Sequence, residues 1–319
     1  RDNLANSYAA MGRTTEATTL RKSVLADRER LLGPEHPATL TARDNLANSY
    51  AAMGRTTEAT TLRKSVLADR ERLLGPEHPD TLDSRNNLAN SYAAMGRTTE
   101  ATTLFKGVLA DRERLLGPSH PATISARSNL AASYAEAGRV TKATTLQEGV
   151  LADQERLLGP EHPETLTARS NLAAFYAAMR RTTEATTLFK GVLADRERLL
   201  GPEHPDTISA RSNLAVSYAE AGRATEATTL QEGVLADRER LLGPEHPDTL
   251  TARNNLANSY MVAGRPERAI TLLTDVLPDC ERLLGPDHPA TLTARNSLAM
   301  ASKLGGDGTA PQVEASPRK

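Results

Sequence analysis

The chain has 319 residues with no Trp, three Phe and seven Tyr, and 39% of its residues are hydrophobic. So few bulky apolar side chains argue against the large core of ordinary globular domains. The 39 Lys and Arg nearly balance 40 Asp and Glu, which gives a formal net charge of −1. Because opposite charges are interspersed, no basic field is expected to hold a phosphate backbone, and nucleic acid is excluded as an expected partner.

A period of 42 residues organises the sequence. Tyr and His each recur once per period, at Tyr8, Tyr50, Tyr92, Tyr134, Tyr176, Tyr218 and Tyr260 and at His36, His78, His120, His162, His204, His246 and His288. Repetition at a fixed interval predicts a repeat architecture. Seven repeats begin near residues 1, 43, 85, 127, 169, 211 and 253.

Glycines divide all but one of the repeats into two segments of helical length. In the second repeat, the first segment carries Leu46 and Tyr50 on one side at helical spacing and ends at Gly54, where a left-handed cap is expected. The second segment begins at Thr56, the expected N-cap, and ends at Gly75 before a proline. Each repeat therefore predicts a pair of helices.

A stiff proline corner, with the sequence GPEHP in most repeats, connects each helix pair to the next. One apolar stripe per helix cannot form a core alone, so the pairs are expected to stack into a single array over residues 1–304. A further helix at about residues 290–304 is expected to cap the last repeat. Residues 305–319 have almost no apolar side chains and are expected to be disordered.

Four positions interrupt the regular pattern. Arg180 replaces the glycine that ends the first helix of other repeats, and a left-handed turn there is strained for a residue with a side chain. Pro278 lies within the last second helix, so a kink or an early helix end near Leu277 is predicted. On the second helices, Arg63 and Arg70 lie within the apolar arc, and their guanidinium groups are expected to extend to water.

Three motifs repeat along the chain: L-A-x-x-Y-x-x-x-G in the first segment, E-A-x-x-L…V-L in the second, and the L-G-P-x-H-P corner. They resemble the tetratricopeptide repeat, in the longer form found in kinesin light chains and many bacterial proteins. The resemblance covers Arg1 to about Leu304 and implies an all-α fold, a right-handed α-solenoid of stacked antiparallel helix pairs. Arg43 stands where the shorter form often has Trp, and Asp69 stands where kinesin light chains usually carry an aliphatic residue, so a thinner packing seam is expected.

Seven histidines at one register raise the question of metal binding. Equivalent residues of adjacent repeats lie roughly two interaxial distances of 8–10 Å apart, whereas zinc needs ligands at about 2 Å. No metal site is therefore expected, and each His is expected to bond within its own corner. No glycine-rich phosphate loop, HExxH or GxSxG motif occurs, and Cys280 has no distinctive partner. The sequence thus predicts no catalytic residue, no cofactor and no enzyme.

The remaining candidate surface is the face of the first helix opposite its apolar stripe. One asparagine occupies the same register on this face in every repeat: Asn3, Asn45, Asn87, Asn129, Asn171, Asn213 and Asn255. An amide both donates and accepts hydrogen bonds, so a row of amides can bind the main chain of an extended peptide. The alternative is that the same amides bond neighbouring repeats to each other.

In the tetratricopeptide family this face lines a concave groove, so the resemblance implies that the asparagine row binds a protein or peptide ligand. Kinesin light chains and chaperone-binding members also use a second register, which the resemblance assigns to Asn6, Asn48, Asn90 and Asn258. In the middle repeats that register holds Ala132, Ala174 and Val216, so the second row is interrupted.

The function predicted first is a peptide-binding scaffold without catalysis. The alternatives are the C-terminal sensor array of a larger signalling ATPase of the STAND or NB-ARC type and a passive spacer. Residue 1 is Arg and lies inside a repeat, which leaves room for a covalently linked upstream domain. No apolar run approaches the roughly 18 residues of a membrane span, so no membrane partner is expected. The single Cys280 favours a reducing, cytoplasmic location.

Overall fold

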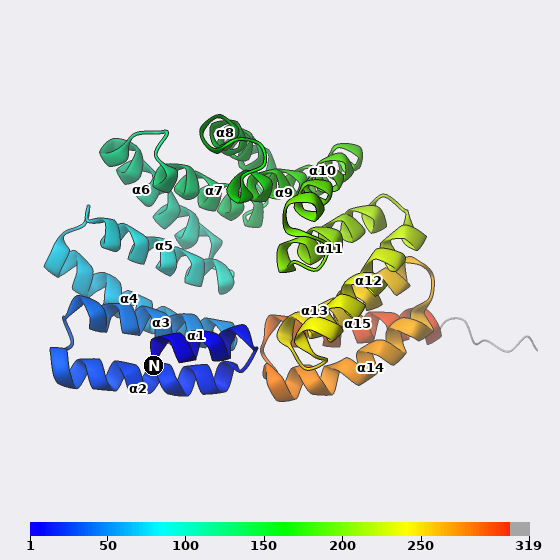
Figure 1. Ribbon diagram of the computed structural model, residues 1–319, viewed down its shortest axis with the longest axis horizontal. Coiled ribbons are helices and arrows are strands. Elements are labelled where there is room, and N and C mark those ends of the chain that lie inside the picture. The colour runs from blue at the N-terminus through cyan, green and yellow to red at the C-terminus, as the bar shows by residue number, and fades with distance from the viewer. Residues whose placement is uncertain (307–319) are drawn as a thin grey trace, which may run out of the picture. The chain divides into compact units, whose positions relative to one another are not determined.

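The computed structural model describes residues 1–306, which form fifteen α-helices and no strand (Figure 1). The first helices of successive repeats are α1 (Asp2–Ala10), α3 (Pro37–Ala52), α5 (Pro79–Ala94), α7 (Pro121–Glu136), α9 (Pro163–Ala178), α11 (Pro205–Glu220) and α13 (Pro247–Val262). The second helices are α2 (Thr14–Leu32), α4 (Thr56–Leu74), α6 (Thr98–Leu116), α8 (Val140–Leu158), α10 (Thr182–Leu200), α12 (Ala224–Leu242) and α14 (Pro266–Leu283). The predicted capping helix is α15 (Pro289–Gly306), and the rest of the predicted tail lies outside the described residues.

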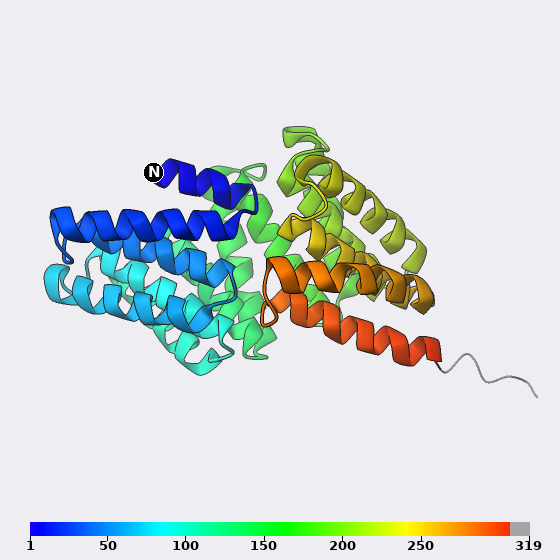
Figure 2. The same cartoon turned by 90° about the horizontal axis from the view of Figure 1, so that it is seen from below.

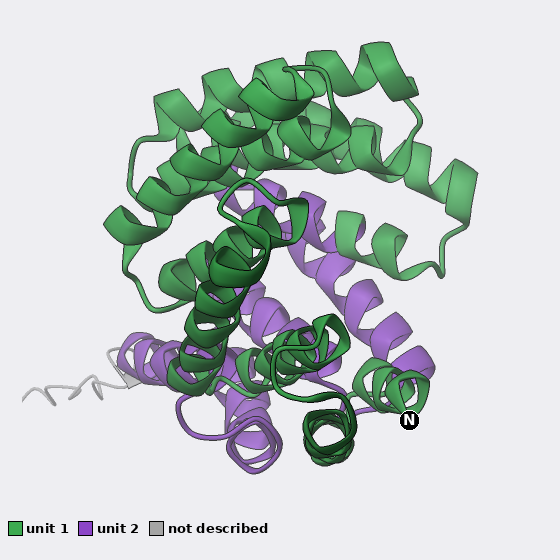
Figure 3. Ribbon diagram, turned by 90° about the vertical axis from the view of Figure 1, so that its left-hand side faces the viewer, with its two compact units in different colours: residues 1–210 green, residues 211–319 purple. Residues whose placement is uncertain are grey.

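The chain divides into two compact units, Arg1–Ala210 and Arg211–Lys319, and the division falls within α11 (Figure 3). In the first unit, each helix from α1 to α9 packs against the helix that follows it in the sequence. Figure 2 shows this packing for the N-terminal helices, which are coloured blue. In the second unit, α12 to α15 pack in the same consecutive way. The all-α solenoid class is confirmed, and one continuous array over residues 1–304 stays a prediction.

The proline corner starts each first helix. In α3, Nδ1 of His36 accepts a hydrogen bond from the main-chain N of Ala38 at 3.1 Å, and Pro37 occupies the first turn. The same bond, at 3.1–3.3 Å, is accepted by His78, His120, His162, His204, His246 and His288. The histidines are therefore helix caps bonded within their own corners. In the part of the chain that the structure describes, no three His, Cys, Asp or Glu side chains gather in a group that could hold a metal.

The second helix begins one residue earlier than its predicted cap implies. Gly54 has φ 71°, and the main-chain N of Arg55 donates to the carbonyl O of Tyr50 at 2.8 Å. Arg55 itself has non-helical angles, φ −80° and ψ 60°, and its carbonyl O accepts from the N of Ala59 at 3.1 Å. Arg55 is thus the N-cap, and the assignment of Thr56 is wrong because the turn after Gly54 already supplies the non-helical residue.

Small side chains and ion pairs fill the space between helices. Ala47, Ala59 and Val66 are at most 1% exposed, which agrees with the scarcity of aromatic residues. Nη1 of Arg43 donates to Oδ2 of Asp69 at 3.0 Å, and the Arg43 side chain is 14% exposed. The same pair recurs at 2.7–3.3 Å as Arg85–Asp111, Arg127–Asp153, Arg169–Asp195 and Arg211–Asp237. An ion pair therefore lies where the resemblance drawn from the sequence implies apolar residues.

The predictions for Arg180 and Pro278 have different outcomes. Arg180 has φ 61°, and no other non-glycine residue among residues 1–306 has a positive φ, so the left-handed turn is confirmed. Helix α14 continues through Pro278 to Leu283, so the predicted helix end near Leu277 is wrong. Pro278 lies on the exposed side of the helix, whereas Val276 and Cys280 are fully buried, and that packing holds the helix together across the missing hydrogen bond.

Candidate peptide-binding surface

Arginines of the second helices reach the second asparagine row. Nη2 of Arg63 donates to Oδ1 of Asn48 at 2.7 Å, and its Nη1 donates to Oγ of Ser91 at 2.5 Å. Arg21 makes the equivalent bond to Asn6 at 3.0 Å. Arg63 is 8% exposed, and its burial lowers the pKa of the guanidinium. The expectation that Arg63 extends to water is wrong because polar side chains of α3 and α5 take the place of water.

The other members of the second row have different surroundings. Phe105 replaces the arginine beside Asn90, which is exposed and makes no side-chain hydrogen bond within the described residues. Oδ1 of Asn258 accepts from Oγ of Ser297 at 3.0 Å, so this amide connects α13 to α15. The side-chain oxygen is therefore already bonded in Asn6, Asn48 and Asn258 but, among residues 1–306, free in Asn90.

The second arginine register is also buried. Nη1 of Arg70 donates to Oδ2 of Asp44 at 2.8 Å and to Oγ of Ser84 at 2.6 Å. Arg70 is 8% exposed, so its predicted extension to water is wrong as well. Burial raises the pKa of the Asp44 carboxyl, and the positive charges of Arg70 and Arg63 oppose that rise.

The first asparagine row divides into bonded and free amides. Nδ2 of Asn129 on α7 donates to Oδ1 of Asn86 on α5 at 2.8 Å, which joins two neighbouring repeats. Among residues 1–306, the amides of five members make no hydrogen bond: Asn3, Asn45, Asn87, Asn171 and Asn255. Asn171 and Asn213 are exposed. The structure thus shows the repeat-joining role at one position and unused donors and acceptors at others.

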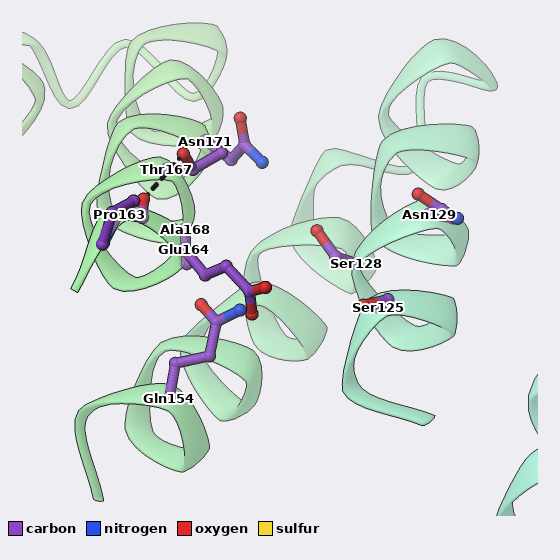
Figure 4. Close-up of a pocket in the computed structure, with 9 residues that line it drawn as sticks. All are labelled: Ser125, Ser128, Asn129, Gln154, Pro163, Glu164, Thr167, Ala168 and Asn171. Carbon is purple, nitrogen blue, oxygen red and sulfur yellow. Dashed lines mark hydrogen bonds between the residues drawn. The ribbon is translucent and has the colours of Figure 1, made fainter. Parts of the chain in front are cut away.

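One pocket lies against the row in each unit. In the first unit, a pocket of about 410 Å³ is lined by Ser125, Ser128, Asn129, Gln154, Pro163, Glu164, Thr167, Ala168 and Asn171 (Figure 4). In the second unit, a pocket of about 400 Å³ is lined by Val216, Ala219, Glu220, Asn255, Asn258, Ser259 and Val262. Most residues that line the first pocket have polar side chains, whereas Val216 and Val262 give the second an apolar wall, so the two pockets suit different side chains.

Cys280 is the single thiol and lies in the core of the second unit. It is fully buried, and burial raises its pKa from 9.0 to about 11. A thiol with so high a pKa is a poor nucleophile at neutral pH. No helix among the described residues is both long enough and apolar enough to cross a lipid bilayer.

Comparison with protein-family models identifies the family of this helical repeat. Two tetratricopeptide repeat models match the chain, one at residues 81–122 and 123–164 and the other at residues 1–68, 164–232, 208–278 and 248–307. The chain belongs to the tetratricopeptide repeat family. A search of curated proteins finds no match to it. The family resemblance that the repeated motifs indicate is therefore confirmed.

Solved tetratricopeptide repeat structures share the fold. A kinesin light chain-like protein from Podospora anserina with nearly identical repeats is 33% identical, with a TM-score of 0.54, over 64% of this chain and 97% of that one. A Rap protein in complex with competence and sporulation factor is 12% identical, with a TM-score of 0.55, over 96% of this chain and 98% of that one. A STAND signal transduction ATPase from Pyrococcus horikoshii, which has a tetratricopeptide repeat sensor, is 14% identical, with a TM-score of 0.54, over 84% of this chain and 39% of that one.

Sequence reasoning did not single out Gln154, which lines the first pocket. Five other repeats hold an arginine at its register: Arg28, Arg70, Arg112, Arg196 and Arg238. Alignment of the repeats with one another shows this exchange, so the signal was present in the sequence. The effect of this exchange depends on the groups to which the arginines of the other repeats bond, and only the structure shows those groups.

Proposed function

We propose that this tetratricopeptide repeat protein is a scaffold that binds an extended protein or peptide segment along the face of its first helices and catalyses no reaction. One observation supports this most directly: first-row amides lie at the pockets, with Asn129 and Asn171 at one and Asn255 at the other. Amides offer donors and acceptors to a peptide main chain, and pockets receive its side chains. Because the stacked helices are ordered before binding, the receptor loses little conformational entropy.

The proposed main-chain contacts are the first-row residues Asn45, Asn87, Asn129, Asn171, Asn213 and Asn255 and the second-row residues Asn48, Asn90 and Asn258. Amides without a protein partner, such as Asn87 and Asn171, can offer both a donor and an acceptor. Arg63 already donates to the acceptor oxygen of Asn48, so Asn48 is expected to serve a peptide as a donor. The free first-row amides are therefore the best positions for a test.

Selection from a random peptide library on the purified chain supplies a ligand for that test. In the variant Asn87→Ala/Asn171→Ala, we expect binding to weaken by about 1–3 kcal/mol, since each hydrogen bond is worth about 0.5–1.5 kcal/mol. The matched control is Thr61→Ala/Thr103→Ala, which removes two exposed polar groups from α4 and α6 and should leave the affinity unchanged. Unchanged binding in the asparagine variant, or ligand protection of the second helices in hydrogen exchange, would contradict the proposal.

The alternative role as the sensor array of a STAND or NB-ARC-like ATPase stays a prediction. At 14% identity, the likeness to the Pyrococcus horikoshii protein concerns the fold alone. A cytoplasmic location likewise stays a prediction. The scaffold proposal rests instead on the amides and pockets of the chain itself.

A further inference from the structure

A guanidinium group occupies the same place in five repeats. The arginines at this register are Arg28, Arg70, Arg112, Arg196 and Arg238. Each donates from Nη1 to the carbonyl O of the second residue of the following first helix, at 2.9–3.3 Å; the acceptors are Ala38, Asp80, Ala122, Asp206 and Asp248. The carbonyl acceptor is thus a constant feature of this place in the fold.

Four of these guanidinium groups also bond to the first helix that precedes them. Arg70 pairs with Asp44, and Arg112 pairs with Asp83, while Nη2 of Arg196 donates to Oγ1 of Thr167 at 3.4 Å. Among residues 1–306, Arg238 bonds only to the carbonyl O of Asp248. Arg28 pairs with Asp2 in the same way as Arg70 with Asp44, so four of the five arginines join two successive first helices by filling the space between them with donors. The walls of that space consist of carbonyl, carboxylate and hydroxyl acceptors.

The fourth repeat has the acceptors but lacks the arginine. Gln154 is 8% exposed, and its Oε1 is buried without a hydrogen-bond partner. Within the described residues, no side chain donates to the carbonyl O of Glu164, which is the register equivalent of the five acceptors. In Figure 4, Gln154 extends from α8 toward the space between α7 and α9, and Ser128 faces that space from α7. The shorter side chain leaves open the pocket of about 410 Å³.

Another repeat that lacks the arginine compensates for the loss. In the seventh repeat Cys280 takes the register, and Nδ2 of Asn254 donates to the carbonyl O of Ala290 at 3.1 Å. The fourth repeat has Ser128 at the position of Asn254, and Ser128 bonds to Gln147 instead, at 3.3 Å. The donor that other repeats supply from their own chain is therefore missing at this pocket.

We propose that this pocket binds the side chain of an arginine in the partner peptide, whose guanidinium takes the place that the chain's own arginines fill in other repeats. A guanidinium has five N–H donors and no acceptor, which matches a pocket lined by the amide of Gln154, whose Oε1 has no hydrogen-bond partner among residues 1–306, and by the carboxylate of Glu164. Glu164 is the only charged residue that lines the pocket, so its charge favours a cation. Asn129 and Asn171 line the same pocket, so a peptide that follows the asparagine row can insert a side chain there.

This inference deepens the proposed function, and its test separates the two. The probes are N-acetylarginine amide and N-acetylcitrulline amide, which have similar shapes but differ in charge, and calorimetry measures their binding to the full chain. We expect the arginine probe to bind about tenfold more tightly than the citrulline probe, because hydrogen bonds from a charged donor are stronger. Equal binding of the two probes, or no binding of the arginine probe, overturns the proposal.

Two variants locate the site. Gln154→Arg supplies the residue that five other repeats use and should abolish arginine binding while the helical circular dichroism and Tm are kept. Glu164→Gln changes one exposed carboxylate and should reduce the preference for arginine over citrulline even if the first variant folds poorly. Binding that persists in Gln154→Arg, or an unchanged preference in Glu164→Gln, overturns the assignment to this pocket.

An alanine peptide with one central arginine distinguishes this proposal from the scaffold proposal. If it binds more tightly than the arginine amide, and Asn171→Ala removes that advantage, both proposals are supported. If it binds no more tightly than the amide, the main-chain role of the asparagines fails while the arginine pocket stands. If library peptides bind at the asparagine row but neither arginine probe binds, the pocket proposal fails and the scaffold proposal stands.

Discussion

At the scale of single residues, the two roles considered for the asparagine row belong to different members of it. Asn129 is bonded across repeats to Asn86, whereas Asn87 and Asn171 have no hydrogen-bond partner among residues 1–306. The sequence could not separate them, because all three share one register and one residue type. What separates them is the residue at the neighbouring register, which varies from Asp44 to Asn86 and Ser128 along the array.

Asn129→Ala should lower the free energy of unfolding by about 0.5–1.5 kcal/mol, since it removes a bond between repeats. Asn87→Ala and Asn171→Ala should change it by less than about 0.5 kcal/mol. Urea unfolding measures these differences, and the double variant Asn86→Ala/Asn129→Ala should lose less than the sum of its single variants. A loss for Asn87→Ala as large as that for Asn129→Ala would show that the row is mainly structural.

Arg180 holds a backbone conformation that the other repeats give to glycine, with φ 61°. Arg180→Gly should therefore raise the free energy of unfolding by about 1 kcal/mol. The reverse exchange is the matched control: Gly96→Arg, at φ 70° with no atom within 4 Å of an added Cβ, should lose a similar amount without a clash. Thermal or urea unfolding of both variants checks the prediction, and a destabilised Arg180→Gly would contradict it.

At the scale of elements, the pattern of apolar residues, glycines and prolines was enough to predict the helices and the bonding of each His within its own corner, but not that these histidines are helix caps. It failed where long-range contacts decide the outcome. Arg63 looks like an exposed cation on an apolar helix, but its partners Asn48 and Ser91 lie 15 and 28 residues away in the sequence. Pro278 ought to end a helix, but the buried residues around it keep α14 intact. The proposed role of Gln154 likewise follows from the hydrogen-bond acceptors around it, which the sequence does not show.

Helix α14 also holds Cys280, whose pKa burial raises from 9.0 to about 11. About one thiol in a thousand is then ionised at pH 8, so alkylation by iodoacetamide should be far slower in the folded chain than in urea. Because the unfolded thiol ionises first, its contribution to stability is present below about pH 9 and is lost as the pH rises toward 11. The alkaline loss should be smaller in Cys280→Ala. Rapid alkylation at pH 8 without denaturant would show that the thiol is accessible.

At the scale of the whole molecule, the first unit is built from contacts between helices that are adjacent in sequence, with α5 and α7 as a further contacting pair. A unit of this kind has a stability that is approximately a sum over repeats and the interfaces between them. Repeats one and two are identical from Arg1 and Arg43 to Pro37 and Pro79, so removal of one of them recreates nearly the same interface with the third.

Deletion of residues 43–84, one full period, should therefore leave a folded protein with a lower free energy of unfolding and a proportionally smaller helical signal in circular dichroism. The matched control is deletion of residues 43–63, which removes half a period and places a second-helix sequence where the next first helix should pack. The half-period deletion should lose far more stability than the full-period deletion, although it removes fewer residues. If the two deletions are equally damaging, the stability of this unit depends on contacts beyond neighbouring repeats, and the additive description fails. If the full-period deletion folds while the half-period deletion does not, register between neighbouring helix pairs is the property that holds the unit together.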